Sequence, residues 1–286
     1  MRLFSNRIKD IIVFVKTELS NLYSDNECRS LALMLLEHFA GISTAVSLAS
    51  PEETINESEL LNIYFAVKDL QKHKPVQYVL GRVTFCGLTI KVNKDVLIPR
   101  PETEELVSII IKENQDGMLK IADLGCGSGC IALALKNMLP QSEVSGFDIS
   151  EKALMIAREN AVCLALDVRF LHADMLKENF SREKFDIIVS NPPYIRNLER
   201  KQMRKNVLLY EPKEALFVPN EHPLKFYEAI EKFSAQNLNS KGKIYLEINE
   251  NLANETAFLF STKKYKVRII KDLFERSRFL AVENLT

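Results

Sequence analysis

The chain has 286 residues, a length that predicts one large domain together with a smaller one. Hydrophobic residues make up 47% of it, which is enough to fill a complete core. Lysine and arginine total 38, as do aspartate and glutamate, so the formal net charge is zero. This balance argues against a broad basic surface for gripping duplex DNA and leaves room only for a local basic patch.

The cysteines and the amino terminus give no sign of export. The five cysteines are odd in number and have no paired CxxC spacing, so the sequence indicates neither a disulfide framework nor a zinc site, and we expect a reducing cytoplasm. The apolar run 11–15 is bounded by Asp10 and Lys16, which makes it too short for a secretion signal or for a helix across a membrane.

Residues 1–73 carry apolar residues at helical spacing, which predicts a small helical bundle. Three groups share this spacing: Ile8, Ile11, Ile12, Val15, Leu19 and Leu22; Leu31, Met34, Leu35 and Phe39; Leu60, Ile63, Tyr64, Val67 and Leu70. We expect the second and third helices to begin near Asn26 and Ser58. No residue here demands chemistry, and His38 and His73 are most simply assigned to a helix face and to the following linker.

Residues 74–98 are predicted to form a linker that carries a β-hairpin. Pro75 ends the helical pattern, and apolar residues then alternate with polar ones from Val83 to Val92, on both sides of Cys86-Gly87. The remaining chain, residues 99–286, is expected to form the large domain.

The segment 97–105 combines two prolines with charged side chains. The prolines predict an extended loop, and Thr103 with the acids that follow it can open a helix. Arg100 and Glu102 are candidates for a substrate site; an ordinary salt-bridged linker is the alternative.

A glycine-rich turn follows the predicted strand 119–124. Three of the nine glycines of the chain fall within Gly125-Cys126-Gly127-Ser128-Gly129, and a helix over 131–138 begins soon afterwards. Glycine lets the backbone come close to a ligand, and a helix amino terminus presents free amides to an anionic group. The pattern predicts a nucleotide-type ligand; a tight turn without a ligand is the alternative.

The spacing of these glycines distinguishes between ligands. A dinucleotide fingerprint that starts at Gly125 and Gly127 needs its third glycine at position 130, where this chain has Cys130. A ligand that presents only a carboxylate to the loop, without a pyrophosphate, fits better. S-adenosylmethionine is such a ligand.

Carboxylates follow the next two predicted strands. Asp148 comes directly after the strand 144–147, where a carboxylate can accept both hydroxyls of a ribose; capping of the following helix is the alternative. After the strand 168–171, Asp174 is a candidate acceptor for the amino group of adenine, and Met175 is a candidate to pack on its ring. Capping or surface solvation is the alternative for Asp174.

The tetrapeptide Asn191-Pro192-Pro193-Tyr194 leaves the carboxyl end of the apolar strand 185–190. Because the two prolines remove two backbone donors, the carbonyls of Asn191 and Pro192 are left free to accept. The Asn191 side-chain oxygen is a further acceptor, and Tyr194 offers a flat face. The motif suits a planar group that carries an NH2, such as a carboxamide or a base; a rigid turn is the alternative.

A basic segment follows the tetrapeptide. Its members are Arg196, Arg200, Lys201, Arg204 and Lys205. A solvated charged face is the usual explanation, and contact with a partner is the other.

The remaining strands complete the predicted sheet. Strands are expected at 243–248, 265–270 and 278–283. Alternation of strand and helix up to residue 248 predicts a parallel sheet, and the short connection between the final two strands makes that pair antiparallel.

Four segments together resemble the bacterial peptide chain release factor glutamine methyltransferases, class I S-adenosylmethionine-dependent enzymes with an Asn-Pro-Pro-Tyr motif. They are residues 75–81 (PVQYVLG), 97–104 (LIPRPETE), 123–130 (DLGCGSGC) and 190–195 (SNPPYI). The resemblance runs from about residue 75 to the end, and the helical amino-terminal segment has the size that the family shows.

The resemblance implies a Rossmann-like α/β fold, with a parallel sheet whose last strand is antiparallel and a small N-terminal helical bundle. It implies that S-adenosylmethionine donates a methyl group to the side-chain amide of the glutamine in the Gly-Gly-Gln motif of release factors, leaving S-adenosylhomocysteine. The partner would be a release factor, with no direct nucleic acid, no membrane and no metal, and the enzyme a cytoplasmic monomer. We further expect residues 1–73 to recognise this substrate, because selecting one glutamine among many needs contacts remote from the reacting amide.

The implied site residues fall into three groups. Asn191, Pro192 and Tyr194 would be catalytic, and Pro193, Arg100 and Glu102 would join them in binding the substrate. The cofactor would be bound by Gly125, Cys126, Gly127, Ser128, Gly129, Asp148, Asp174, Met175 and Asn191.

An amide nitrogen is a poor nucleophile, and no His, Cys or Lys adjoins the tetrapeptide in sequence as an obvious base. Positioning must therefore carry most of the catalysis, with acceptors at Asn191 and Pro192 stabilising the charge that develops on nitrogen.

Two alternatives stay open. An adenine-amino DNA or RNA methyltransferase would use the same acceptors for a flipped base stacked on Tyr194, although the zero net charge and the lack of a further sequence-reading domain after residue 200 stand against it. A noncatalytic cofactor-binding adaptor is the other, and Asn191 together with the glycine loop argues against it.

Overall fold

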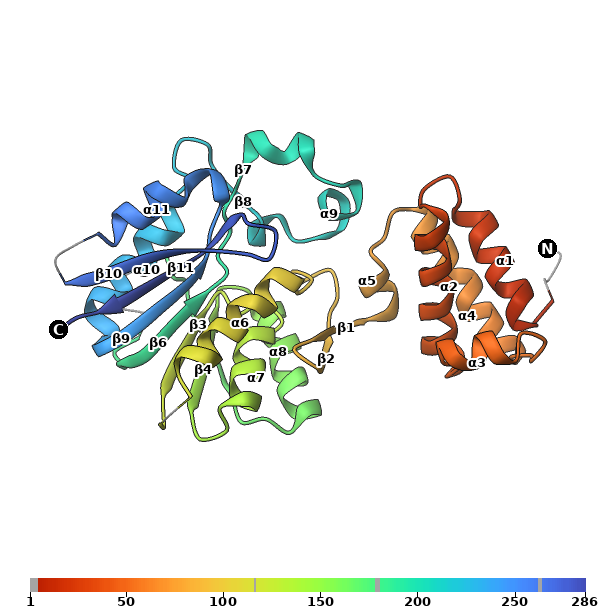
Figure 1. The fold of residues 1–286 in the computed structure, drawn as a ribbon, viewed down its shortest axis with the longest axis horizontal. Helices are drawn as coiled ribbons and strands as arrows, with labels where there is room; N and C mark the ends of the chain where they lie inside the picture. Colours follow the sequence, from red (N-terminus) through yellow and green to blue (C-terminus); the bar gives the residue numbers. More distant parts are fainter. Residues whose placement is uncertain (1–4, 116, 178–180, 262–263) are drawn as a thin grey trace. The chain divides into compact units, whose positions relative to one another are not determined.

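The computed structural model describes residues 5–115, 117–177, 181–261 and 264–286, and these form two compact units (Figure 1). The first unit contains the chain up to Gly81 together with Arg204–Tyr210. The second contains Arg82–Met203 and Glu211–Thr286. Among the described residues, no helix combines the length and the apolar character needed to cross a membrane.

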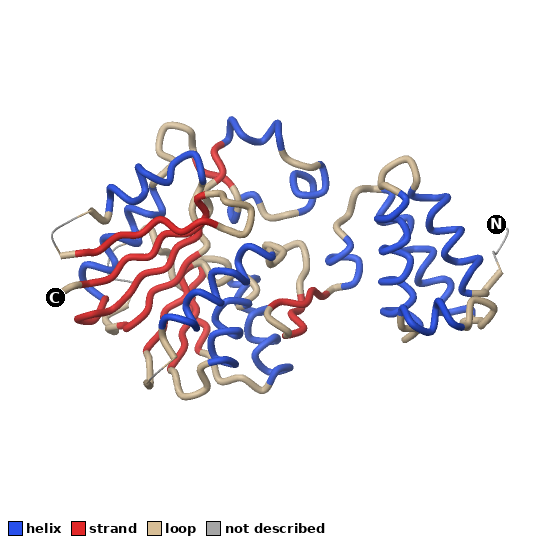
Figure 2. The backbone as a smooth tube through the Cα atoms, in the orientation of Figure 1, coloured by secondary structure: helices blue, strands red, loops and turns tan. Residues whose placement is uncertain are grey.

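The first unit is helical, as the apolar spacing predicts (Figure 2). Its helices are α1 (Ile8–Leu19), α2 (Asp25–Ala40), α3 (Thr44–Ala49), α4 (Glu57–Gln71), α5 (Val76–Leu80) and α9 (Lys205–Tyr210). The apolar faces of α1, α2 and α4 share one core that includes Ile11, Leu35 and Ile63. The helical bundle is thereby confirmed.

The expected starts near Asn26 and Ser58 lie one residue after the observed first residues of α2 and α4, Asp25 and Glu57. Helix α2 is capped by Ser24 and α4 by Asn56, so both begin before Asn26 and Ser58. In each case the capping side chain accepts from a backbone amide three residues on, and a glutamate there bonds back to the amide of the cap. This reciprocal box, rather than the first apolar residue, sets the helix start.

The second unit is built on a seven-stranded sheet. Its strands are β3 (Lys120–Leu124), β4 (Glu143–Asp148), β5 (Arg169–His172), β6 (Phe185–Ser190), β9 (Leu238–Glu247), β10 (Tyr265–Lys271) and β11 (Ser277–Asn284), in the spatial order β10-β11-β9-β6-β3-β4-β5. Adjacent strands from β9 to β5 pair in parallel, whereas β11 runs antiparallel to both β9 and β10. The predicted parallel sheet with an antiparallel last strand is confirmed.

Helices cover both faces of this sheet (Figure 1). One face is covered by α6 (Pro101–Glu113), α7 (Cys130–Met138) and α8 (Glu151–Leu164), and the other by α10 (Lys225–Asn237) and α11 (Ala253–Leu259). The buried core on the α10 side includes Leu124 and Ile188 of the sheet and Tyr227 of α10. Burial on both faces is seen in β3 and β6, where residues 121–124 and 187–190 are all buried.

Short elements complete the second unit. The expected hairpin consists of β1 (Arg82–Phe85) and β2 (Leu88–Lys91), paired antiparallel. The others are β7 (Ile195–Arg196), β8 (Phe217–Val218) and the 3-10 helices η1 (Asn197–Gln202), η2 (Lys213–Ala215) and η3 (Glu250–Leu252). Helix α6 begins at Pro101, before Thr103, because proline at the first helical position has a suitable φ and needs no amide partner.

Parallel pairing brings the carboxyl ends of β3, β4, β6 and β9 to one edge of the sheet. The glycine loop, Asp148, Asn191 and Glu247 all follow or end these strands. At this edge the Ser190 hydroxyl donates to the Leu124 carbonyl (2.5 Å) and ties the ends of β6 and β3 together. Such an edge is where ligands bind in open α/β sheets.

Candidate functional site

A cavity of about 660 Å³ lies at this edge of the sheet. Seven of the residues predicted for the site line it: Gly125, Gly127, Asp148, Asp174, Met175, Asn191 and Pro193. The opposite wall comes from the segments around η2, β8 and the start of α10, including Phe217 and Phe226. Its volume lies within the range of small-molecule and cofactor sites.

The glycine loop is shaped by close contacts and left-handed backbone. Gly125 has φ of 76° and Gly129 has φ of 80°, and a Cβ on Gly129 would lie 2.8 Å from the Phe170 ring. Gly129 is also the cap residue from which α7 starts. Cys126, Ser128 and Gly129 are not among the lining residues, so the structure brings only Gly125 and Gly127 of the loop to the cavity wall.

Buried polar groups hold the loop from below. The Asn160 side chain donates to the Ser128 carbonyl (2.9 Å) and accepts from the Lys91 amide (2.7 Å), which links the loop to α8 and β2. Asp123 accepts from the Ala132 amide (3.2 Å), and burial raises its pKa to about 7. No local sequence pattern predicted these contacts of Asn160 and Asp123.

Asp148 faces the cavity with both oxygens already oriented. Oδ2 accepts from the Gly127 amide and Oδ1 from the Ser150 amide, each at 2.8 Å. Burial raises the pKa of Asp148, and these backbone bonds oppose that rise. Each carboxylate oxygen can accept more than one hydrogen bond, so the two amides leave capacity for a ligand. The cap of α8 is supplied by Ser150, which accepts from the Ala153 amide.

The cavity is rich in negative charge. Its lining includes four carboxylates, on Asp95, Asp148, Asp174 and Glu214, against one lysine, Lys225. Asp174 Oδ1 accepts from the Leu176 amide (3.0 Å) in a local turn, which agrees with the capping role given as the alternative to an adenine contact. Asp174 also lines the cavity. This lining favours a ligand with positive charge.

The Asn191 side chain is held by a chain of hydrogen bonds that starts on α6. Its Nδ2 donates to Thr103 Oγ1 (3.2 Å), and Thr103 donates to Glu247 Oε2 (2.8 Å). Asn191 also lines the cavity, and the structure gives its Oδ1 no hydrogen-bond partner within the described ranges. The amide oxygen is therefore available to accept from a ligand.

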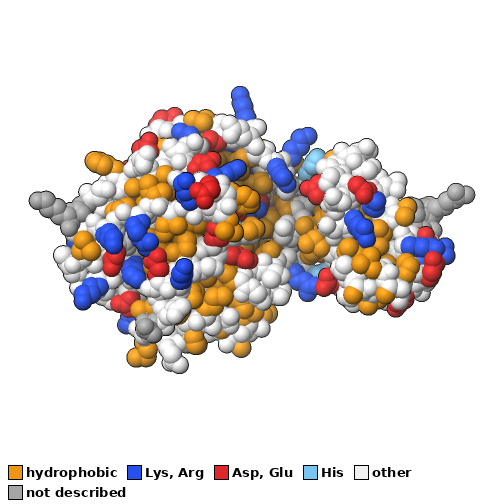
Figure 3. All heavy atoms as spheres, in the orientation of Figure 1, with side chains coloured by type: hydrophobic (Ala, Val, Ile, Leu, Met, Phe, Trp, Pro, Cys, Tyr) orange, Lys and Arg blue, Asp and Glu red, His pale blue; other side chains and the backbone are white. Residues whose placement is uncertain are grey.

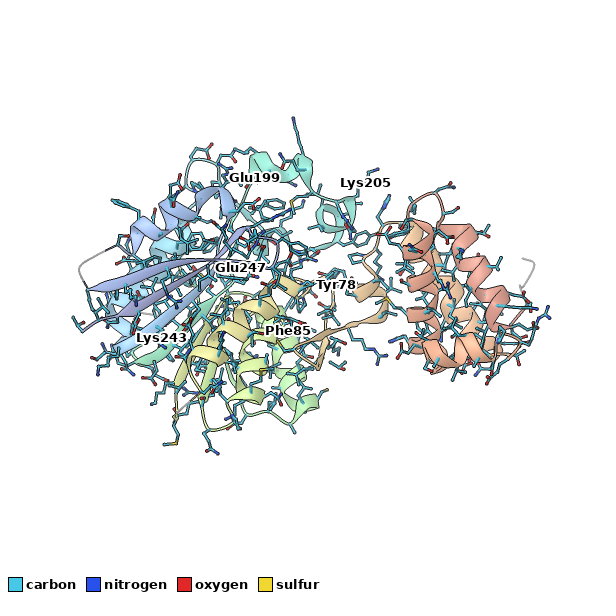
Figure 4. The ribbon with its side chains drawn as sticks, viewed as in Figure 1. Tyr78, Phe85, Glu199, Lys205, Lys243 and Glu247 are labelled. Carbon is cyan, nitrogen blue, oxygen red and sulfur yellow. The ribbon has the colours of Figure 1, made fainter. Side chains whose placement is uncertain are left out.

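Glu247 ends β9 and is labelled in Figure 4. Its second oxygen, Oε1, accepts from the Tyr194 hydroxyl (2.8 Å). Burial raises the pKa of Glu247, whereas Thr103, Tyr194 and the Arg278 charge lower it. Burial and the nearby Glu247 carboxylate raise the pKa of Tyr194 well above its ordinary value. Tyr194 therefore stays protonated as a donor, and it is not among the cavity-lining residues.

Pro192, Arg100 and Glu102 also lie off the cavity lining. Pro192 is buried, and among the described residues its carbonyl has no hydrogen-bond partner. Arg100 forms an ion pair with the buried Glu211 (2.6 Å), whose other oxygen accepts from the Ile98 amide (3.3 Å). This geometry matches the salt-bridged linker that the sequence left as an alternative for Arg100.

The basic segment after the tetrapeptide is divided between the two units. Arg196 pairs with Glu199 (3.1 Å), and Arg200 lies over the Phe217 ring, 4.8 Å from its centre. Arg204 and Lys205 belong to the first unit. On the face drawn in Figure 3, acidic and basic side chains are interspersed, as the zero net charge suggests.

Sequence reasoning missed the residues that support Asn191. Glu247 and Thr103 are both 2% exposed, so they are internal supports rather than lining residues. A carboxylate at the end of a predicted strand was the only signal available for Glu247. In the part of the chain that the structure describes, no group of histidine, cysteine, aspartate and glutamate residues is arranged to hold a metal ion.

Two protein-family models match the chain. The methyltransferase small domain matches residues 102–220, and the PrmC N-terminal domain matches residues 11–81.

Curated relatives match over nearly the whole length. The release factor glutamine methyltransferase of Flavobacterium psychrophilum is 41% identical, covering 92% of this chain and 94% of that protein. The protein of the same name from Bacteroides thetaiotaomicron is 40% identical, covering 94% of this chain and 98% of its own. That of Bacillus subtilis is 35% identical, with 95% and 96% covered.

Solved structures share the fold. A methyltransferase from Pyrococcus furiosus superposes with a TM-score of 0.52 at 21% identity, covering 70% of this chain and 89% of that one. The 16S rRNA N2 G1207 methyltransferase of Thermus thermophilus, solved with AdoMet and guanosine, gives a TM-score of 0.50 at 19% identity, covering 71% and 49%. At these identities the likeness extends to the fold alone.

Proposed function

Because the chain belongs to the release factor glutamine methyltransferase family, we propose that it methylates the side-chain amide nitrogen of a release factor glutamine, the one in the Gly-Gly-Gln motif. S-adenosylmethionine would be the methyl donor and S-adenosylhomocysteine the product. The observation that carries the proposal is the Asn191 amide, which lines the cavity with its oxygen free to accept.

The lining residues fit this donor. S-adenosylmethionine, when bound, supplies an electrophilic methyl group on a positively charged sulfur. The acidic lining suits that charge, and Asp148 can accept the ribose hydroxyls while its orientation is kept by Gly127 and Ser150. Asp174 and Met175 would contact the adenine. Gly125 and Gly127 allow close approach of the backbone, and Cys126, Ser128 and Gly129 shape the loop.

The substrate amide would be held by acceptors. Asn191 Oδ1 and the Pro192 carbonyl would accept its two N–H groups, which stabilises positive charge as it develops on nitrogen. Pro193 lines the cavity beside them, and Tyr194 would act through Glu247. The Tyr194 hydroxyl stays protonated, so Tyr194 would not take the amide proton. The new carbon–nitrogen bond would form as the carbon–sulfur bond of the donor breaks, and the proton would then leave the nitrogen to solvent. Arg100 and Glu102 remain predictions for the outer part of the substrate.

Selection of one glutamine among many requires contacts away from the reacting amide. We assign these contacts to the helical domain, residues 1–73, which carries no catalytic chemistry of its own. The proposed partner is the body of the release factor, and the enzyme would act as a cytoplasmic monomer.

The test is incubation of the enzyme with a purified release factor and a methyl-labelled donor, followed by mass mapping of the modified residue. A release factor whose motif glutamine is replaced by asparagine and an enzyme with Asn191→Ala are the matched controls. Adenine-containing single-stranded DNA and RNA form a separate arm. The proposal requires label on the motif glutamine alone; label on nucleic acid instead would favour an adenine-amino methyltransferase.

A further inference from the structure

We propose that Thr103 and Glu247 are positioning residues that set which way the Asn191 side-chain amide faces. The proposal rests on the proposed function and deepens it. It follows from the direction of each hydrogen bond between Asn191 and the end of β9.

Glu247, at the buried end of this series of hydrogen bonds, sets which group donates and which accepts in each of them. The hydrogen bonds from Thr103 and Tyr194 and the Arg278 charge favour the ionised form of Glu247 against the effect of burial. An ionised carboxylate only accepts hydrogen bonds, and a hydroxyl has one hydrogen to donate. Glu247 Oε1 accepts from the Tyr194 hydroxyl and Oε2 accepts from the Thr103 hydroxyl, each at 2.8 Å, so the one hydrogen of Thr103 lies on Glu247. Thr103 Oγ1 can then only accept, and the group it accepts from is Asn191 Nδ2.

This direction decides what the substrate meets. With Nδ2 committed to Thr103, the other end of the amide, Oδ1, is left for the cavity. The reverse orientation would present an NH2 group to the substrate NH2, and two donors cannot bond to each other. Because Thr103 and Glu247 are 2% exposed, water has no access to replace either partner. If these residues only had to pair their buried polar groups, the Asn191 amide could face either way. The observed order, with Asn191 donating to Thr103 and Thr103 donating to Glu247, allows only one orientation.

The sharpest test exchanges the carboxylate and the amide between the two positions. In Asn191→Asp alone, the Thr103 hydrogen stays on Glu247, so an oxygen of the introduced carboxylate faces the Thr103 lone pairs and turnover should fall about 100-fold or more. Adding Glu247→Gln gives Thr103 a donor, which frees the Thr103 hydrogen for the new carboxylate. The other carboxylate oxygen can then accept from the substrate.

We therefore expect the double variant Asn191→Asp with Glu247→Gln to turn over at least about tenfold faster than Asn191→Asp alone, a part of the loss assigned to one preorganised hydrogen bond. Both are assayed with a release factor that the wild-type enzyme methylates, so a failure of the proposed function would show in the wild type first. If Glu247→Gln leaves Asn191→Asp unchanged or slows it further, the positioning role is wrong.

A second pair of variants keeps the inference testable if the exchange does not fold. Thr103→Ser keeps the hydroxyl, and Thr103→Val keeps the shape without it. We expect the serine variant to lose less than about threefold in kcat and the valine variant to lose about 10- to 100-fold, with the Kd for S-adenosylhomocysteine unchanged in both. Equal turnover of the two variants, or a loss of cofactor affinity that matches the loss of kcat, would overturn it.

Discussion

Replacing Asp148 by alanine should weaken cofactor binding by at least about 100-fold. The carboxylate faces the cavity, and its two oxygens are aimed by the amides of Gly127 and Ser150, each at 2.8 Å. Each charge-assisted hydrogen bond to a ribose hydroxyl is worth roughly 1.5 to 3 kcal/mol, so the loss of two corresponds to about 3 to 6 kcal/mol. Every 1.4 kcal/mol is a factor of about ten in Kd.

Calorimetric titration with S-adenosylhomocysteine measures this loss directly. Alanine also removes the partner of Gly127 and Ser150, so a second ligand that lacks both ribose hydroxyls is needed to separate the ribose contact from loop disorder. The wild type should discriminate strongly between the two ligands, and Asp148→Ala should hardly discriminate. Asp95→Ala is the comparison variant, because it removes the same charge from the same cavity; it should keep the preference for the ligand with ribose hydroxyls.

Two results would refute the reasoning. One is an unchanged Kd in a folded Asp148→Ala enzyme. The other is an undiminished preference of that variant for the ligand with ribose hydroxyls, which would place the ribose contact on a different residue.

Three further changes have definite expected outcomes. Asn191→Ala should lower turnover by about 100- to 1000-fold while calorimetry shows near-normal cofactor affinity, and a parallel loss of both would contradict the assigned role. Burial raises the pKa of Asp123 to about 7 in the folded chain, against 3.8 in the unfolded chain, so ionisation of this group lowers the free energy of unfolding as pH rises between those values. Because asparagine does not titrate, the free energy of unfolding of Asp123→Asn, measured by urea titration, should fall by about 2 kcal/mol less between pH 5.5 and 8 than that of the wild type. An equal fall in the two proteins would show that Asp123 is not the cause. Phe65, which is 58% exposed on α4, should contribute to the release factor contact, so Phe65→Ser should lower kcat/KM for the whole factor about tenfold and leave a Gly-Gly-Gln peptide unaffected; equal losses for both substrates would count against recognition by the helical domain.

The parts of the site that the sequence predicted are those whose chemistry is local. A glycine turn between a strand and a helix, an aspartate at a strand end and an Asn-Pro-Pro-Tyr each carry their signal within a few residues. The structure brings Gly127, Asp148 and Asn191 to one cavity because parallel strands end at a common edge. The topology of the sheet was predictable for a similar reason, since strand and helix alternate and the last connection is short.

The supporting contacts could not be predicted, because they join residues far apart in sequence. Thr103 and Glu247 are separated by 144 positions, and Arg100 and Glu211 by 111. Arg100 and Thr103 lie in the distinctive segment 97–105, but nothing near them in sequence identifies Glu211 and Glu247 as their partners. Only the packing of α6 against the sheet brings Thr103 to Glu247. The starts of α2 and α4 were predicted to within one residue, because the signals that begin a helix lie next to it in sequence.

The placement of β11 has a consequence for the order in which a newly made chain becomes active. Strand β11 lies between β9 and β10, and its Phe279 is in register with Glu247, yet a ribosome delivers residues 277–284 after both of these neighbours. The strands that carry the glycine loop and Asp148 emerge much earlier and pair with one another, with β5 and with β6. During synthesis the half of the sheet that holds the loop can therefore assemble first, while the end of β9 waits for its last partner. A chain arrested before residue 277 would contain the strands of the nucleoside side of the cavity, whereas the end of β9 that carries Glu247 would lack its partner β11.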